Sequence, residues 1–323
     1  MRKIIRIAGI SLVALAVLAG IGALFISVRG VPSYAVPAIP PRAVAVTPAR
    51  LAQGEKLAVA MCADCHLNKS TRSLTGGLLA DLPPQFGRLY ATNITQDPTH
   101  GISRWTDAEL IGLLRTGIGR DGRYRLIMPK FVHMSDEDIN SLVVFLRSNH
   151  AWVQPKAVVS PPQQPSFLAK ALTYTVMKPA PLPTQAIVEP PASDPVALGH
   201  YLVTARYLCY DCHSQSFQTN NELEPEKSKG YLGGGNEFIS TDGSTITSRN
   251  LTMDSETGLG DWTAEEFTRT VKYGLSTRRP VRAPMPRFSV MSDEEARAIF
   301  AYLQTVPKIK AEAPEAQATV AAR

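Results

Sequence analysis

The sequence predicts a mostly α-helical protein in which two tandem modules follow an N-terminal transmembrane helix. Three observations lead to this prediction: an uncharged run near the N-terminus, an internal repeat, and matching helix start and stop signals in both copies of the repeat. Alternation of apolar and polar residues, the sign of half-buried strands, is scarce. We therefore expect small helical modules with long loops.

Residues 1–30 are predicted to form a membrane anchor. The run IAGISLVALAVLAGIGALFISV at 7–28 has twenty-two residues without a charge, enough at 1.5 Å per residue to cross a hydrocarbon core of about 30 Å. Arg2, Lys3 and Arg6 precede it, which predicts a single-pass protein of a bacterial inner membrane with its soluble part in the periplasm. The alternative is a cleaved signal peptide, whose apolar region usually has only about 7 to 15 residues.

The net charge of +6 belongs to the N-terminal segment. Residues 1–50 hold six arginines and lysines and no acid, so acidic and basic residues balance in the remainder of the chain. A basic surface for nucleic acid is therefore not expected.

An internal repeat determines the predicted architecture. Residues 92–117 and 249–274 share eight residues at a constant spacing of 157 positions, and the match continues from 128–138 to 285–295. Ten prolines between 155 and 195 predict an extended connection between the copies. After the anchor, the predicted order is a linker at 31–50, module 1 at 51–150, a proline-rich linker at 151–195, module 2 at 196–306 and a flexible tail at 307–323.

Helix signals recur at matching positions in the two modules. Thr106 and Glu109 form a capping box, and Trp105 before them can pack back on the helix. Gly117 is suited to end that helix in a left-handed conformation. The equivalent signals, and the serines expected to cap the final helices, are Trp262, Thr263, Glu266, Gly274, Ser135 and Ser292.

All four cysteines lie in two C-x-x-C-H motifs, at 62–66 and 209–213. A disulfide between cysteines three apart would be strained, and a four-cysteine zinc site is an alternative because paired C-x-x-C motifs are its usual spacing. Neither gives the histidines a role, whereas c-type haem attachment uses two thioethers and an adjacent histidine ligand. We therefore predict two covalently bound haem c groups, attached through Cys62, Cys65, Cys209 and Cys212, with His66 and His213 as axial iron ligands.

The second axial ligand is predicted to be methionine. Met128 and Met285 correspond in the repeat and are each followed by proline, which stiffens a loop that could hold a thioether against iron. The alternative for these two side chains is core filling, which we expect for Met134 and Met291, directly before the helix caps. Lys130 and Arg287, beside the predicted ligands, are expected to be solvated surface charges.

Each module resembles a class I cytochrome c, with the cysteine motif first, the methionine loop late and a terminal helix last. In that family the first and last helices cross at a glycine against an aromatic residue, which implies Gly54 with Phe145 and Gly199 with Tyr302. The pattern TNIT…W(T/S)…MP…MSDE is similar to the cytochrome subunits of membrane-bound alcohol, gluconate and related dehydrogenases. Those subunits usually carry three haem modules, whereas this chain has two.

Because histidine and methionine would fill both axial positions, we expect an electron-transfer protein or subunit rather than an enzyme. The expected donor is a membrane-bound dehydrogenase or a quinol-oxidising complex, and the expected acceptor is another cytochrome or a terminal oxidase. The alternative is a haem enzyme, such as a dihaem peroxidase or a thiosulfate-oxidising cytochrome. The latter would favour a cysteine ligand, and the chain has no fifth cysteine.

Overall fold

The computed structural model describes residues 2–240, 244–278 and 280–310. Most of the predicted tail at 307–323 lies outside them. The structure is mostly helical, and its strands are short pieces in three two-stranded antiparallel sheets. The helices are α1 (Arg2–Arg29), α2 (Pro48–Leu57), α3 (Ala63–His66), α4 (Asp107–Thr116), α5 (Asp136–Leu146), α6 (Phe167–Thr175), α7 (Pro195–Tyr201), α8 (Cys209–His213), α9 (Ala264–Tyr273) and α10 (Asp293–Leu303), and the paired strands are β1 (Gly77–Leu78) with β3 (Tyr90–Ala91), β2 (Gly87–Arg88) with β4 (Gln164–Pro165), and β5 (Glu237–Ile239) with β6 (Thr245–Thr247).

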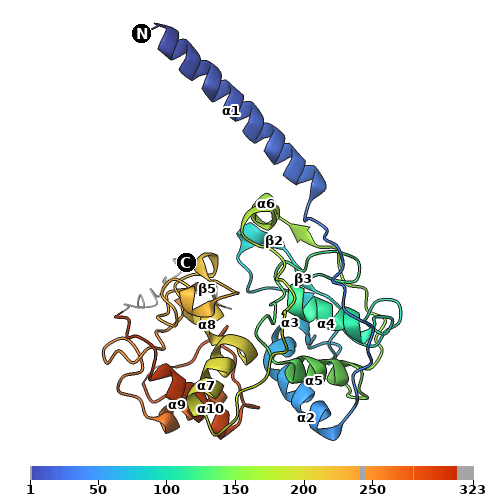
Figure 1. Ribbon diagram of the computed structural model, residues 1–323, viewed down its shortest axis with the longest axis vertical. Coiled ribbons are helices and arrows are strands. Elements are labelled where there is room, and N and C mark those ends of the chain that lie inside the picture. The colour runs from blue at the N-terminus through green and yellow to red at the C-terminus, as the bar shows by residue number, and fades with distance from the viewer. Residues whose placement is uncertain (1, 241–243, 279, 311–323) are drawn as a thin grey trace, which may run out of the picture.

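Helix α1 projects away from the rest of the molecule (Figure 1). Its segment Lys3–Arg29 has a mean hydropathy of 2.5 and is the one helix among the described residues that is long and apolar enough to cross a membrane. None of the most apolar stretch is buried by the protein. A helix that is apolar all round and uncovered needs an apolar environment from elsewhere.

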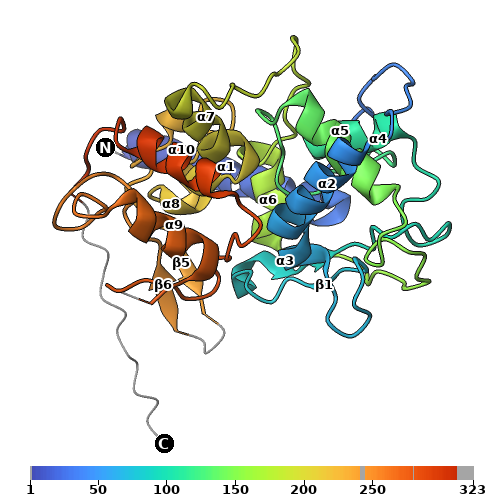
Figure 2. The ribbon, with the colours of Figure 1, turned by 90° about the horizontal axis from the view of Figure 1, so that it is seen from below.

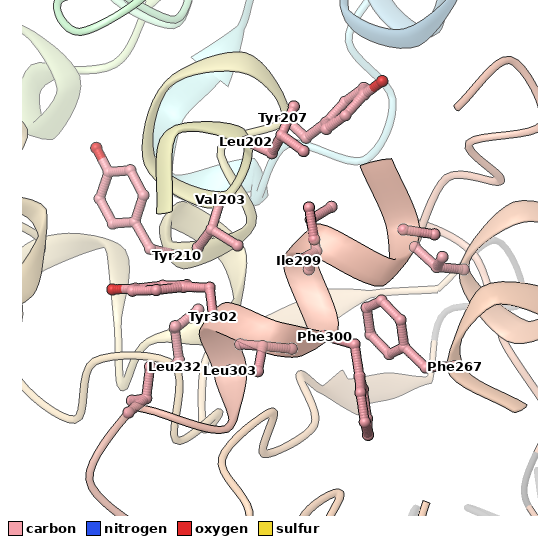
Figure 3. Packing of buried hydrophobic residues seen from close by; sticks show 14 of the residues in the cluster. Leu202, Val203, Tyr207, Tyr210, Leu232, Phe267, Ile299, Phe300, Tyr302 and Leu303 are labelled. Carbon is pink, nitrogen blue, oxygen red and sulfur yellow. The ribbon is translucent and has the colours of Figure 1, made fainter. Parts of the chain in front are cut away.

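The body consists of two lobes, each with its own core (Figures 1 and 2). The first lobe contains α2 to α5, and the second lobe contains α7 to α10. In the second lobe, side chains of α10 such as Ile299 and Leu303 lie among those of Leu202 and Phe267 (Figure 3). The two lobes use equivalent helices in the same order.

The first and last helices of each lobe cross at a glycine, as the family resemblance implied. A Cβ placed on Gly54 of α2 would lie 2.0 Å from the Ser141 carbonyl oxygen and 2.8 Å from the Phe145 Cβ of α5. On Gly199 of α7, the distance to the Cβ of Tyr302 in α10 would be 2.7 Å. Only glycine permits backbones to approach this closely.

The predicted helix ends are confirmed. Thr106 and Thr263 both form complete capping boxes, and Gly117 and Gly274 end the same helices with φ of 76° and 72°. Serines cap α5 and α10 as expected. The first helices begin slightly earlier than the predicted module boundaries, because Thr47 and Asp194 are N-caps each followed by a proline at the first helical position.

The proline-rich linker is packed on the first lobe. Strand β4 pairs with β2, and the Ala180 amide donates to the Thr116 carbonyl at the end of α4 over 3.2 Å. Within the linker, α6 is capped by Ser166. The chain between the lobes is therefore anchored along its length rather than hanging free.

A buried ion network joins the two lobes. Arg206, whose side chain is 3% exposed, donates to Asp138 over 2.7 Å and to Glu295 over 2.8 Å. These carboxylates occupy equivalent positions in α5 and α10, at the spacing of the repeat. The hydroxyl of Tyr201 donates to Asp138 over 2.6 Å, and Lys56 of the first lobe reaches Glu295. One arginine thus connects the same place in both lobes.

Candidate functional site

Each C-x-x-C-H motif ends on a short helix that follows a π-helical turn. In the first lobe the turn at Ala58–Cys62 leads into α3, and in the second lobe the turn at Leu202–Arg206 precedes α8. The wider π turn shifts the register of the helix, a feature frequent at functional sites. The turn follows the first helix in both lobes, but it includes Cys62 in the first lobe, whereas Tyr207 and a left-handed Leu208 separate it from Cys209 in the second.

Both histidines are held by the same hydrogen bond. Nδ1 of His66 donates to the Thr92 carbonyl over 2.8 Å, and Nδ1 of His213 donates to the Arg249 carbonyl over 2.7 Å. Since a carbonyl can only accept, the proton is on Nδ1 and the lone pair of Nε2 is available to a metal. Burial lowers the pKa of both rings, although the backbone hydrogen bond opposes it. A neutral imidazole with a fixed tautomer is the form that ligates iron.

The four cysteines carry free thiols that are not joined as disulfides. Burial raises the pKa of Cys62 to about 12 and of Cys65 to about 11, and it raises those of Cys209 and Cys212 to about 12. Thiols in redox-active C-x-x-C motifs have lowered pKa values instead. Across the described part of the chain, no three His, Cys, Asp or Glu side chains gather as a metal-ion site, so the four-cysteine zinc alternative is not formed.

The predicted methionine ligands lie in loops that are fixed on both sides. The Met128 amide donates to the Arg125 carbonyl over 3.1 Å, and the Met285 amide donates to that of Arg282 over 3.0 Å. Three residues after each methionine, a phenylalanine amide donates to the preceding helix, to α4 in the first lobe and to α9 in the second. By contrast, Met134 is fully buried and Met291 is 1% exposed, which confirms both as core side chains.

Equivalent half-buried side chains gather on each core. The motif cysteine Cys62 and the loop methionine Met128 both pack against the core of the first lobe. Cys209 and Met285 pack against that of the second lobe. The set is completed by Ile94 and Trp105 in the first lobe and by Leu251 and Trp262 in the second. These side chains come from separate loops and helices. In each lobe they place a cysteine and a methionine sulfur at the edge of the apolar core.

The Asn-x-Thr segments brace the turns that hold the histidines. Asn93 directly follows Thr92, is 3% exposed and accepts from the amide of Thr95 over 2.9 Å. Asn250 is 2% exposed and accepts from Thr252 over the same distance. Their side-chain amides donate to backbone carbonyls, so both are structural and closed to glycosylation as folded. These asparagines position the carbonyls that orient the imidazoles.

The sequence did not predict that the two motifs lie near each other. Met61 and Leu208, which immediately precede the first cysteines, each pack against both cores. Burial is the main cause of the raised pKa values of Cys65 and Cys212, and the carboxylate of Asp81 contributes to both. The lobes therefore meet along the edges that carry the cysteines. The signal that the sequence offered for this contact was a large apolar residue directly before each motif, Met61 and Leu208.

The donor groups fit haem c. Each lobe offers two thiols three residues apart, an adjacent histidine with Nε2 available, and a methionine in a fixed loop on the same core. The thiols suit thioether attachment to the porphyrin, and the imidazole and the methionine sulfur suit ligation of its iron.

Comparison with known proteins agrees with this chemistry. Residues 49–146 match the family described as cytochrome C oxidase, cbb3-type, subunit III. The chain is 30% identical to the cytochrome c subunit of the quinone-dependent alcohol dehydrogenase of Gluconobacter oxydans, over 81% of this chain and 55% of the relative. It is 29% identical to the gluconate 2-dehydrogenase cytochrome c subunit of Pantoea cypripedii, over 79% of this chain and 59% of the relative.

A shorter relative matches over most of its own length. The diheme cytochrome c-type protein of Cereibacter sphaeroides is 27% identical, over 77% of this chain and 83% of the relative. In contrast, the chain spans about half the length of the alcohol dehydrogenase subunits that it matches.

Proposed function

This chain carries a cytochrome c-type domain, and on that basis we propose that it is a membrane-anchored dihaem electron carrier. The observation that supports this most is the duplication of one complete donor set: two thiols, a histidine oriented through Nδ1 and a loop methionine occur at equivalent places in both lobes. The family match at residues 49–146 covers the set in the first lobe. We assign the set in the second lobe because it occupies the equivalent positions of the repeat.

We assign the covalent attachment to Cys62 and Cys65 in module 1 and to Cys209 and Cys212 in module 2. His66 with Met128 and His213 with Met285 are the proposed axial pairs. The modules are those of the sequence, 51–150 and 196–306, and they correspond to the first and second lobes. Each lobe has its own core and its own crossing of first and last helices, which supports treating them as separate class I cytochrome c modules.

The proposed residues favour electron transfer over substrate chemistry. Haem c, when bound, supplies a one-electron couple whose potential is raised by histidine–methionine ligation. The carbonyls of Thr92 and Arg249 orient the imidazoles, and burial favours their neutral form by lowering the pKa of both rings. With haem bound, the hydrogen-bonded loops around Met128 and Met285 would offer a thioether to the iron in place of a substrate. Two protein ligands on one iron leave no position open for catalysis, which argues against the peroxidase and thiosulfate-oxidising alternatives.

We further propose a location on the periplasmic face of a bacterial inner membrane, with α1 as a single-pass anchor. The uncovered apolar length of α1 and the basic residues before it support this orientation. The proposed donor is a membrane-bound dehydrogenase or a quinol-oxidising complex, and the proposed acceptor is another cytochrome or a terminal oxidase. Relatives named as subunits of alcohol and gluconate dehydrogenases support a dehydrogenase donor.

Counting covalent haem in the purified, acid-extracted protein tests the attachment. We expect two haems per chain, falling to one in Cys62→Ala/Cys65→Ala and to one in Cys209→Ala/Cys212→Ala. A chain without covalent pigment would overturn the proposal. One covalent haem per chain would restrict the proposed attachment to the first lobe, which the family match covers.

Optical spectra of single methionine variants test the axial ligands. Met128→Ala and Met285→Ala should each remove about half of the methionine–iron absorption at long wavelength, whereas the buried matched controls Met134→Leu and Met291→Leu should keep it all. If both alanine variants had unchanged spectra, the carrier assignment would fail while haem attachment would stand. Loss of the band on adding peroxide or thiosulfate to the unaltered protein would indicate an enzyme.

A further inference from the structure

Helix α6 lies beside the end of α1, at the top of the first lobe (Figure 1). The rings of Phe25 in α1 and Tyr174 in α6 make an edge-to-face contact with centroids 5.8 Å apart. Ala23 and Ile26 are partly covered, unlike most of α1. The linker helix therefore touches the last turns of the apolar segment.

The depth of this contact follows from helix geometry. The uncharged run of α1 ends at Val28, and Phe25 lies three residues before that end. At 1.5 Å per residue this places Phe25 about 4.5 Å inside the apolar run. Since a run of this length matches the hydrocarbon core, α6 lies at the level where acyl chains meet headgroups.

The apolar face of α6 points outward. Ala169 and Thr173, which face the protein, are fully buried, whereas Phe167 is 48%, Leu168 44% and Val176 66% exposed. A helix on the surface of a water-soluble body normally shows the opposite arrangement, with large apolar side chains facing the core. Phe167 and Leu168 on α6 and Val176 at its C-cap therefore face away from the lobe, and Leu172 is half-buried.

The charge around α6 suits an anionic surface. No aspartate or glutamate occurs from 139 to 188, and within that stretch Lys170 lies on α6 while Lys178 follows it. The ammonium of Lys178 donates to the Thr173 carbonyl over 2.9 Å, which keeps this charge beside the helix. Basic residues flanking an exposed apolar helix face are typical of helices that lie in a membrane interface.

We propose that α6 is an interfacial helix that lies on the bilayer beside α1, with Phe167, Leu168 and Val176 inserted among the lipids. This inference rests on the proposed anchoring by α1. It adds a second attachment, because α6 is fixed to the first lobe through the β2–β4 pair and through the Ser166 amide, which donates to the Phe86 carbonyl over 3.0 Å. The first lobe is then held in one orientation against the membrane rather than swinging on a tether.

Lipid photo-crosslinking of the full-length haem protein tests the inference. The protein would be placed in vesicles of phosphatidylcholine and phosphatidylglycerol that contain a phospholipid with a diazirine in its acyl chain, and adducts would be located by mass spectrometry. We expect adducts on α1 and on Phe167, Leu168 or Val176, but not on the matched control Val188, an apolar linker residue that is 80% exposed. The double variant Phe167→Gln/Leu168→Gln should lose most of the α6 adducts while keeping those on α1 and an unchanged haem spectrum.

The possible results separate the two proposals. Adducts on α1 but not on α6 would overturn the interfacial helix, would point to a protein partner on that face, and would leave the anchor intact. Adducts on neither helix would overturn the anchor together with the inference. Equal adducts on α6 and Val188 would also contradict it, because exposure alone would then explain the labelling.

Discussion

The two lobes share the hydrogen bonds around their proposed iron ligands but differ in their charged side chains. The bonds from the histidines, the Asn-x-Thr braces and the methionine-loop amides recur with matching partners. In contrast, Arg115 of the first lobe pairs with Asp136, whereas Lys272 occupies its place in the second lobe and pairs with Asp293. The hydrogen bonds around the proposed ligands are thus common to the lobes, whereas this ion pair keeps its charges but changes the basic side chain from arginine to lysine.

The lobes also differ in what closes them. In the first lobe, the Asn93 side chain donates to the Lys156 carbonyl of the linker over 2.8 Å. In the second lobe, Asn250 donates over 2.6 Å to the carbonyl of Ile309, just after the last helix. The equivalent bond therefore fixes the linker between the lobes in the first lobe, and the segment that follows α10 in the second.

The largest expected effect tests whether both helix crossings are equally tight. Gly54→Ala and Gly199→Ala should each reduce the stability of their own lobe by about 3 kcal/mol or more, because the added Cβ would overlap a backbone carbonyl. The matched control is Gly112→Ala in α4, whose Cβ would make only ordinary contacts, the nearest at 3.5 Å. Hydrogen exchange resolved by peptide measures each lobe separately. Wild-type protection in either crossing variant would contradict the close approach.

The next effect concerns the arginine that joins the lobes. Arg206→Gln should cost about 3 kcal/mol, because Asp138 and Glu295 remain buried with less compensation. Arg50→Gln, which removes a pair with the exposed Glu137, should cost less than about 1 kcal/mol. Hydrogen exchange should show the loss on α5 and α10 together. Loss confined to the second lobe would mean that the network does not couple the lobes.

A smaller effect distinguishes the closures of the lobes. Asn93→Ala and Asn250→Ala should each cost about 2 kcal/mol, since the buried amides and carbonyls they bind lose their partner. Limited proteolysis should then cut Asn93→Ala in the linker near Lys156, and Asn250→Ala near Ile309. If both variants were cut at the same sites, the two asparagines would not be holding the separate segments at Lys156 and Ile309.

Sequence reasoning succeeded where a structure is determined by local chemistry or by the repeat. The capping boxes and the left-handed Gly117 and Gly274 follow from residues a few positions apart or from their duplicates, whereas the glycine crossings were implied by the family resemblance. The early start of the first helices had a local signal in the dipeptides Thr47-Pro48 and Asp194-Pro195. The paired iron ligands stay a prediction, supported by the common core on which cysteine and methionine lie.

What the sequence could not supply is the contact between lobes. Lys130 was expected to be a solvated charge, and this was wrong: its side chain is 6% exposed and binds Glu222 of the second lobe over 2.8 Å. Its duplicate Arg287 is exposed, as expected. The networks around Arg206 and the shared packing of Met61 depend on how the lobes face each other, and no periodicity within either lobe encodes that arrangement.

The smallest expected effect is one that should not distinguish the lobes at all. Thr106 and Thr263 cap α4 and α9 with the same reciprocal bonds, each accepting from the amide of the third helical residue over 3.2 Å. Thr106→Ala and Thr263→Ala should therefore cost the same, about 1 kcal/mol, and should affect exchange only in the first turn of each helix. If one substitution reduced the free energy of unfolding several times more than the other, α4 and α9 would differ in how they support the methionine loops that follow them. Thr106→Ser and Thr263→Ser, which retain the hydroxyl, should restore most of the loss and so confirm that the cap bond is its cause.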